Sequence, residues 1–210
     1  MYALNYVKAK SVKEAAELLA ANPDAKLLSG GMTLIPTLKQ RLAKPFAVMA
    51  DGKFGSTYPN GCHIVEVEVD PATGGTEIVA YSAVDDYGVV INHTVVQGQV
   101  HGGVVQGIGQ VLGEHIQYDR ETGQLLTGSF MDYCMPRAGW LRGIKGDGHP
   151  TPSKVSPLGV KGVGESGCTG SIPAVANAVM DALHTAGIGH IDMPLTPSRV
   201  WHALQSAKKT

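Results

Sequence analysis

The stretch Pro157-Leu-Gly-Val-Lys-Gly-Val-Gly-Glu-Ser-Gly167 places a single acid, Glu165, after a glycine-rich loop and before a helix-like run. Glycine has no Cβ, so its main chain can approach a bulky ligand closely. The neighbouring apolar residues favour desolvation of Glu165 and a role for it as a base. A flexible surface loop that ends in a helix cap explains the same residue types, and on those types alone it is the better interpretation.

Several other segments accompany this loop in a fixed order along the chain. They are Thr57-Tyr-Pro-Asn-Gly-Cys-His-Ile-Val-Glu-Val-Glu-Val-Asp70, Gly98-Gln-Val-His-Gly-Gly-Val-Val-Gln-Gly-Ile-Gly109, Gly128-Ser-Phe-Met-Asp-Tyr-Cys-Met-Pro136 and Met193-Pro-Leu-Thr-Pro-Ser-Arg-Val-Trp201. Together with the loop, they closely resemble the C-terminal end of the large, molybdenum-binding subunit of the xanthine dehydrogenase, aldehyde oxidase and carbon monoxide dehydrogenase family. The resemblance covers roughly residues 50 to 205 and rests on several motifs, which makes it specific.

The N-terminal residues resemble a different subunit of the same enzymes. Ser11-Val-Lys-Glu-Ala-Ala-Glu-Leu-Leu19 and Leu28-Ser-Gly-Gly-Met-Thr-Leu-Ile-Pro36 are similar to the opening of the FAD-binding medium subunit. We therefore expect two parts, an FAD-subunit-like unit at residues 1–50 and a molybdopterin-binding-domain-like region at residues 51–210. The junction between them is expected near residues 45 to 56.

Composition excludes several classes of protein. The 210 residues are 43% hydrophobic with a net charge of −1, which indicates a globular chain. The sequence contains no cluster of Lys and Arg, so we expect neither nucleic acid nor an anionic membrane as a partner. No leader and no apolar run of about 18 residues is recognisable, so we expect a cytoplasmic protein. Three scattered cysteines, Cys62, Cys134 and Cys168, are expected to be reduced thiols.

The N-terminal unit is predicted to be a small β-α-β-α unit. Ser11 and Glu14 form a capping box, and Val12, Ala15 and Leu18 give the following helix one apolar face. That helix should run to about residue 21. A strand at residues 26–28, a helix from about residue 34 and a strand at residues 46–50 are expected to follow.

The second part is predicted to be a mixed α/β fragment, so that the fold class of the whole chain is α+β. Residues 64–69 alternate strictly and predict a half-buried strand, which pairs with a strand at 77–84 and is then interrupted at residues 85–88. The remaining expected elements are a helix at 95–116, a turn at 118–123, a loop without periodicity at 139–156, a helix at 171–185 and a helix from Thr196 to about Ala207.

The helix expected at residues 95–116 contains six glycines, each of which costs roughly 1 kcal/mol relative to alanine. Close packing of another backbone, or of a cofactor, against the bare glycine face would compensate for this cost. The sequence therefore predicts a buried helix near a cofactor site.

The resemblance implies a molybdenum ion held by a pterin cofactor, and an oxidoreductase that inserts water-derived oxygen at an electron-poor carbon. It implies that Glu165 is the base at the molybdenum, that Gln99 hydrogen-bonds the molybdopterin, and that Lys161, Gly162, Val163 and Gly164 form the backbone segment around that cofactor. An amide side chain can both donate and accept, which suits a pterin edge. An exposed glutamine in a helix turn is the alternative for Gln99.

The flavin resemblance implies a turn that lies against FAD, formed by Gly30, Gly31, Met32, Thr33 and Leu34. The family has a second glycine turn further along its FAD domain, which this chain does not supply, and this argues against stable FAD binding. The eight histidines show no metal-ligand spacing and are expected to be solvated or capping residues. Cys134 and Cys168 are expected to be small core residues.

Two functional hypotheses follow. In the first, the chain is a component of a molybdenum-dependent hydroxylase, incomplete alone, whose partners are the iron–sulfur, FAD and large molybdenum subunits. In the second, it is a non-catalytic fusion remnant or subunit-interaction protein that associates with such subunits or with itself, because a truncated domain leaves sheet edges exposed.

Overall fold

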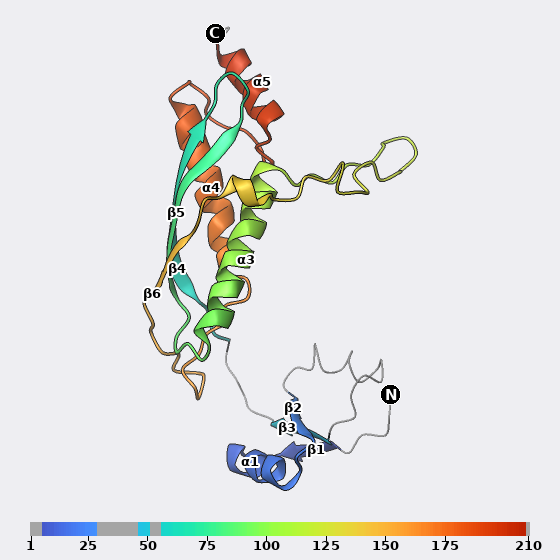
Figure 1. Ribbon diagram of the computed structural model, residues 1–210, viewed down its shortest axis with the longest axis vertical. Coiled ribbons are helices and arrows are strands. Elements are labelled where there is room, and N and C mark those ends of the chain that lie inside the picture. Colours follow the sequence, from blue (N-terminus) through green and yellow to red (C-terminus); the bar gives the residue numbers. More distant parts are fainter. Residues whose placement is uncertain (1–5, 29–45, 51–55, 209–210) are drawn as a thin grey trace. The chain divides into compact units, whose positions relative to one another are not determined.

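The computed structural model describes residues 6–28, 46–50 and 56–208, and the chain divides into two compact units, Met1–Phe54 and Gly55–Thr210 (Figure 1). Each unit has its own sheet and its own cluster of buried side chains. They are therefore described separately. The mixture of strands and helices confirms the predicted α+β class.

The first unit is a parallel sheet with a helix. Its elements are β1 (Tyr6–Ala9), α1 (Val12–Ala21), β2 (Ala25–Leu28) and β3 (Phe46–Ala50), and β3 lies between β1 and β2. Ser11 caps α1 as predicted, because its hydroxyl accepts from the N–H of Glu14 at 3.1 Å. Val12 was wrongly assigned to the apolar face, since its side chain is exposed at the first position of the helix. The helix expected from residue 34 lies outside the described residues.

The sheet of the second unit has the order β4-β5-β6. β4 (Asn60–Val69) and β5 (Thr76–Asp86) form the predicted antiparallel hairpin, and β6 (Lys145–Gly148) pairs in parallel with β5. Two expectations were wrong. β5 continues through Asp85 and Asp86, where an interruption was predicted, and the segment 139–156 contains β6 because β5 offers it a free edge.

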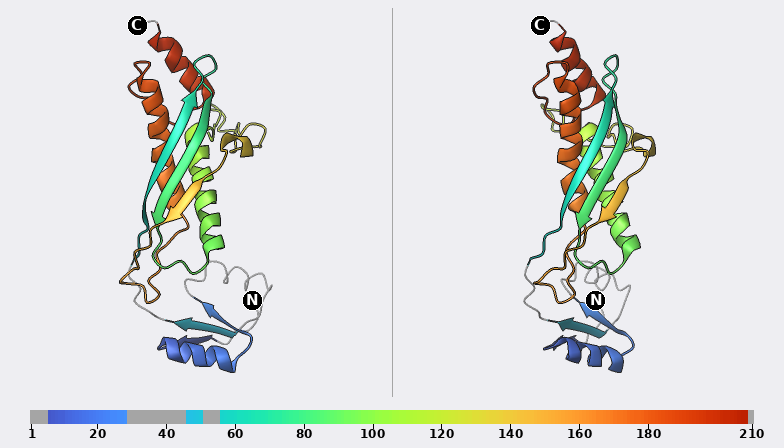
Figure 2. Two further views of the ribbon diagram at one scale, coloured as in Figure 1. Left: turned by 60° about the vertical axis from the view of Figure 1, so that its left-hand side comes forward. Right: turned by 90° about the vertical axis from the view of Figure 1, so that its left-hand side faces the viewer.

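Two long helices, α3 (His93–Leu112) and α4 (Ser166–His184), lie side by side against one face of this sheet, with α5 (Pro197–Ala207) near the C-terminus (Figure 2). The core lies between the sheet and the helices. Its most deeply buried side chains are Ile78, Tyr81, Val104, Ile108, Val111, Val175, Val179, Leu183, Leu195 and Val200. Thr196 and Pro197 open α5 as predicted, whereas α4 starts five residues before the predicted Ser171.

The contact between α3 and α4 uses glycines on both helices. A Cβ on Gly103 would lie 2.9 Å from the backbone nitrogen of Cys168, and a Cβ on Gly107 would lie 2.7 Å from Cβ of Ser171. Around Gly98 and Gly102 there is nothing within 4 Å. The predicted compensation by a packed backbone is thus confirmed for one glycine face of α3, while the other face is open.

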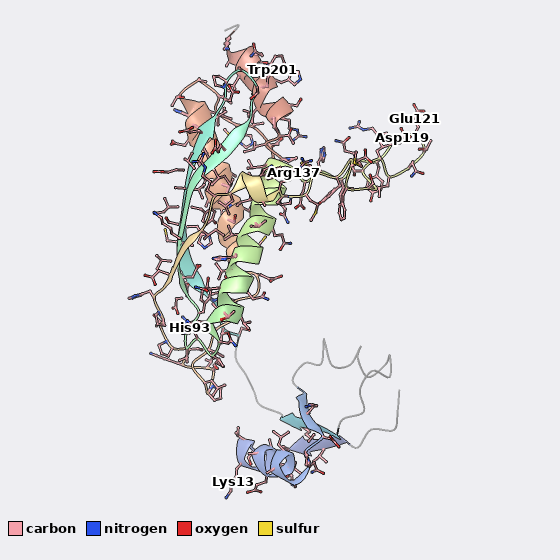
Figure 3. The ribbon with its side chains drawn as sticks, viewed as in Figure 1. Lys13, His93, Asp119, Glu121, Arg137 and Trp201 are labelled. Carbon is pink, nitrogen blue, oxygen red and sulfur yellow. The ribbon has the colours of Figure 1, made fainter. Side chains whose placement is uncertain are left out.

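Residues 114–137 form an arm that leads away from the end of α3, with Asp119 and Glu121 near its tip and Arg137 at its base (Figure 3). A short 3-10 helix, Ala138–Trp140, returns the chain to the sheet. Two apolar side chains of the arm, Phe130 and Met131, are 81% and 94% exposed. In the described part of the chain, no helix combines the length and hydropathy that crossing a membrane requires.

Candidate functional site

The glycine-rich loop ends where α4 begins, and Glu165 is the residue at that boundary. Its backbone carbonyl accepts from the N–H of Thr169 at 3.0 Å and from the Thr169 hydroxyl at 3.1 Å, which starts the helix. The Glu165 side chain makes no capping hydrogen bond and is exposed. The expectation that apolar neighbours desolvate Glu165 is therefore wrong for this chain, because Val163 turns into the core instead of covering the acid.

Gln99 approaches the same loop from α3. Its side-chain oxygen, Oε1, lies 3.8 Å from the position that a Cβ on Gly164 would take. Gln99 is exposed, as its alternative interpretation predicts, yet it reaches the residue next to Glu165. The structure thus brings Gln99, Gly164 and Glu165 together from two separate segments.

A groove of about 850 Å³ runs beside the loop and the first turns of α4. Gly162, Gly164 and Glu165 line it, and a Cβ on Gly162 would meet no atom within 4 Å. The loop therefore presents bare backbone to an open space, as its glycines predict. The other lining residues are Thr57, Tyr58, Pro59, Asn60, Gly61, His63, Asp85, Val163, Ser166, Thr169, Gly170, Pro173, Ala174 and Asn177.

Lys161 is held away from solvent by an ion pair. Its ammonium nitrogen lies 2.5 Å from Oδ2 of Asp86, and its backbone N–H donates to the carbonyl of Tyr87. The other oxygen of Asp86 accepts from the N–H groups of Gly88 and Thr151. Hydrogen bonds from Lys161 and from these amides hold the pKa of Asp86 well below its usual range. Lys161 therefore anchors the loop to β5.

A largely buried polar cluster, which sequence reasoning missed, forms part of the groove wall through His63 and Asp85. The ring of His63 on β4 contacts two residues of β5: Nε2 lies 3.2 Å from Oδ1 of Asp85, and Nδ1 lies 2.7 Å from the hydroxyl of Tyr81. The Tyr87 hydroxyl donates to Asp85 at 2.5 Å. The side chains of His63 and Asp85 are only 4% and 6% exposed. His63 is thus neither solvated nor a cap, which corrects the expectation for this histidine.

Burial alone would raise the pKa of Asp85, but hydrogen bonds from His63 and Tyr87 outweigh burial and lower it. Burial raises the pKa of Tyr81 to about 12, so this phenol stays protonated. A signal for the cluster existed in the sequence. His63 falls in the same alternation as Val65, Val67 and Val69, which places it on the inner face of β4.

The remaining predicted residues fall outside this site. Gly30, Gly31, Met32, Thr33 and Leu34, expected to contact FAD, lie outside the described residues. The three cysteines are free; Cys134 is exposed and not a core residue, because it lies on the arm, while Cys168 is partly buried on α4.

The chain matches the family model of the molybdopterin cofactor-binding domain over residues 3–141, a span that includes Gln99 and stops before Glu165. It is 41% identical over 149 residues to the carbon monoxide dehydrogenase large chain of Hydrogenophaga pseudoflava, which covers 71% of this chain. It is 44% identical over 146 residues to the nicotine 6-hydroxylase large subunit of Paenarthrobacter nicotinovorans, which covers 70% of this chain. The chain spans 18% of the length of each of these relatives.

A solved structure shows the same fold. The reconstituted CO dehydrogenase from Oligotropha carboxidovorans superimposes with a TM-score of 0.69 at 38% identity, over 72% of this chain and 19% of the other. The superimposed part of the chain thus has a fold found in a CO dehydrogenase, and the matching family model is that of a molybdopterin cofactor-binding domain. The chain belongs to the molybdopterin cofactor-binding domain family, within the molybdenum hydroxylases, and this confirms the predicted family and its class of cofactor. The resemblance of residues 1–50 to an FAD-binding subunit stays a prediction.

Proposed function

We propose that this chain is a component of a molybdenum-dependent hydroxylase, in which Glu165 acts as the base and Gln99 contacts the molybdopterin cofactor. The observation that carries the proposal is the convergence of the Gln99 side chain on Gly164, directly beside Glu165. The two relatives described above are large subunits of a carbon monoxide dehydrogenase and a nicotine hydroxylase, which supports this class of reaction.

The residues present fit a pterin. The open faces of Gly162 and Gly164 allow a flat ligand to lie against the main chain, and the Gln99 amide can donate and accept at a pterin edge. Val163 contributes its backbone only, since its side chain packs on the core. Lys161 holds this segment in place through Asp86, and its charge is already paired.

When bound, the cofactor supplies two-electron redox chemistry, which no side chain of the protein provides. The task left to Glu165 is to take up and release a proton beside it. A base works best when its pKa lies near the working pH, and burial raises the pKa of a carboxylate. Glu165 is exposed in this chain, so we propose that a second chain covers the groove and desolvates this acid.

The partners proposed are chains that supply the rest of a large molybdenum subunit, together with iron–sulfur and FAD subunits. The relatives described above are named as a large chain and a large subunit, which supports partner subunits in general. So does the arm, whose exposed Phe130 and Met131 form an apolar surface suited to another protein.

Elemental analysis for molybdenum, with a visible spectrum for flavin, tests the proposal on protein purified natively with its accompanying chains. We expect stoichiometric molybdenum in the wild-type assembly and a marked reduction for Gln99→Ala. Glu165→Gln should retain the metal and lose hydroxylase activity, since an exposed side chain can change without unfolding the chain. Absence of the metal from the assembly, or activity that survives Glu165→Gln, would contradict the proposal.

A second candidate is a non-catalytic subunit-interaction protein, which the exposed apolar side chains of the arm favour. This function requires binding through the arm without any cofactor. Phe130→Ser with Met131→Ser should then abolish association with the partner chain, measured by size-exclusion chromatography, in protein that contains no molybdenum. Association that is unchanged by the double substitution would argue against it.

A further inference from the structure

The His63 ring lies between the sheet and the start of α4, and it touches both. On one side its two nitrogens contact Asp85 and Tyr81 of β5. On the other side the ring lies against Gly170, where a Cβ would be 2.6 Å from Cε1, 2.7 Å from Nδ1 and 2.8 Å from Nε2. The ring is therefore in direct contact with the backbone of α4, one turn beyond Glu165.

The hydrogen bonds of the cluster select one tautomer of His63. An ionised Asp85 can only accept, so Nε2 of His63 carries the proton and donates to it. In the neutral imidazole, Nδ1 is then an acceptor, and the Tyr81 hydroxyl donates to it. With both nitrogens engaged and a side chain 4% exposed, the ring has one orientation.

The opposite side of the first turn of α4 is also fixed. A Cβ on Gly167 would lie 2.5 Å from the carbonyl oxygen of Val100, so the backbone of α4 lies against that of α3. The Ser171 hydroxyl donates to the carbonyl of Val104 at 2.9 Å. Residues 166–171 thus have the His63 ring on one side and α3 on another, and Glu165 immediately precedes them.

We propose that His63, oriented by Asp85 and Tyr81, is a positioning residue that sets the first turn of α4 and thereby the location of Glu165. The inference rests on the proposed role of Glu165 as the base. It assigns a role in this site to a histidine on β4, outside the glycine-rich loop. The hydrogen bond from the N–H of Thr169 to the carbonyl of Glu165 reports directly on this turn.

Amide hydrogen exchange by NMR on the full chain without cofactor tests the proposal. His63→Ala should speed exchange of the Thr169 amide about tenfold or more, with little change at Val179 and Leu183 further along α4. His93→Ala, which removes an exposed histidine at the start of α3, serves as the matched control and should leave Thr169 unchanged. Equal acceleration along all of α4, or none at Thr169, would overturn the proposal.

Two replacements separate positioning by hydrogen bonds from simple filling of space. His63→Gln keeps one donor and one acceptor and should restore part of the Thr169 protection, whereas His63→Leu fills the volume without polar groups and should not. Equal protection in both variants would overturn the proposal, and this comparison holds if His63→Ala fails to fold. In the wild-type chain, ¹⁵N shifts of the ring should show a protonated Nε2; a protonated Nδ1 alone would contradict the assigned tautomer.

These measurements do not depend on molybdenum. A native assembly that lacks the metal overturns the proposed function, while the exchange pattern separately decides whether His63 fixes the turn. In an assembly that does contain the metal, His63→Gln should change kcat more than KM, because a displaced base affects the chemical step more than substrate binding. A change confined to KM would count against positioning of the base.

Discussion

Gly103 of α3 and Gly167 of α4 lie backbone to backbone. A Cβ on Gly103 would be 3.1 Å from Cα of Gly167, and a Cβ on Gly167 would be 2.9 Å from the backbone nitrogen of Val104. The obstacles are main-chain atoms, so no side-chain rotation relieves the contact. The two helices can approach this closely only while both positions are glycine.

Neighbouring glycines of α3 should consequently respond in opposite ways to alanine. Gly103→Ala should lower the free energy of unfolding by about 1–3 kcal/mol through overpacking. A Cβ added at Gly102 would have no atom within 4 Å. Gly102→Ala should therefore raise the free energy of unfolding by about 0.5–1 kcal/mol, because alanine has the higher helix propensity. Urea denaturation of the two variants measures both effects, and a Gly102→Ala variant as unstable as Gly103→Ala would show that the helix faces are assigned incorrectly.

The buried Asp85 should make stability depend on pH. Its folded pKa is lowered, so the stability it contributes is fully present above the unfolded value of about 3.9 and is lost as pH falls through the lower folded value. Asp85→Asn should therefore lower the free energy of unfolding near neutral pH by about 1–3 kcal/mol. The difference between wild type and variant should shrink as pH falls below about 4. A difference independent of pH would contradict the ionised state of Asp85.

Two ion pairs of β5 should differ in importance. Asp86 binds Lys161 and two backbone amides and so holds the loop in place, whereas Glu77 pairs with Arg142 where both side chains are largely in solvent. Asp86→Ala should lower the denaturation midpoint and speed proteolysis within residues 149–161, while Arg142→Ala should change neither appreciably. Limited proteolysis with mass spectrometry compares the two variants. Equal rates of cleavage within residues 149–161 in both would argue against the anchoring role of Lys161.

Cys168 should react slowly with alkylating reagents. Burial raises the pKa of its thiol first, and the negative charges of Glu165 and Glu114 add to this. At about pH 8 it should be modified more slowly than the exposed Cys62 and Cys134 within the same molecule. Glu165→Gln should speed its modification, because it removes a negative charge that raises the pKa of the thiol, and Glu121→Gln on the arm should not. Equal rates in these two variants would mean that Glu165 does not act on Cys168.

The periodic segments of this fold could be predicted from the sequence, and the contacts between them could not. The valine alternation at residues 64–69 and the Thr196-Pro197 cap appear in the structure as predicted. β6 was missed because a four-residue strand of Lys, Gly and Asp has no hydrophobic pattern; it forms because the edge of β5 is available. The early start of α4 was missed because Gly167 and Gly170 disfavour a helix locally, and packing on α3 and His63 compensates.

The site shows the same division. The sequence motifs indicated Glu165 and Gln99, and the structure places them beside Gly164. Burial depends on the neighbours that an element acquires in the fold. For this reason Glu165 was expected to be desolvated but is exposed, and His63 was expected to be solvated but is buried. A histidine in step with core valines is the sequence pattern that should have indicated an inward-facing polar cluster.

The distribution of the core along the chain has a consequence for synthesis. Ile78 and Tyr81 of the hairpin are covered by α3, α4 and α5, and the last of these core residues, Leu204, follows about 125 residues later. At about 5–20 residues per second, the apolar face of the nascent hairpin stays uncovered for roughly 6 to 25 seconds during translation. The core of the second unit can therefore close only after α5 has been synthesised, and until then the apolar face of its hairpin is available to chaperones that shield apolar strands.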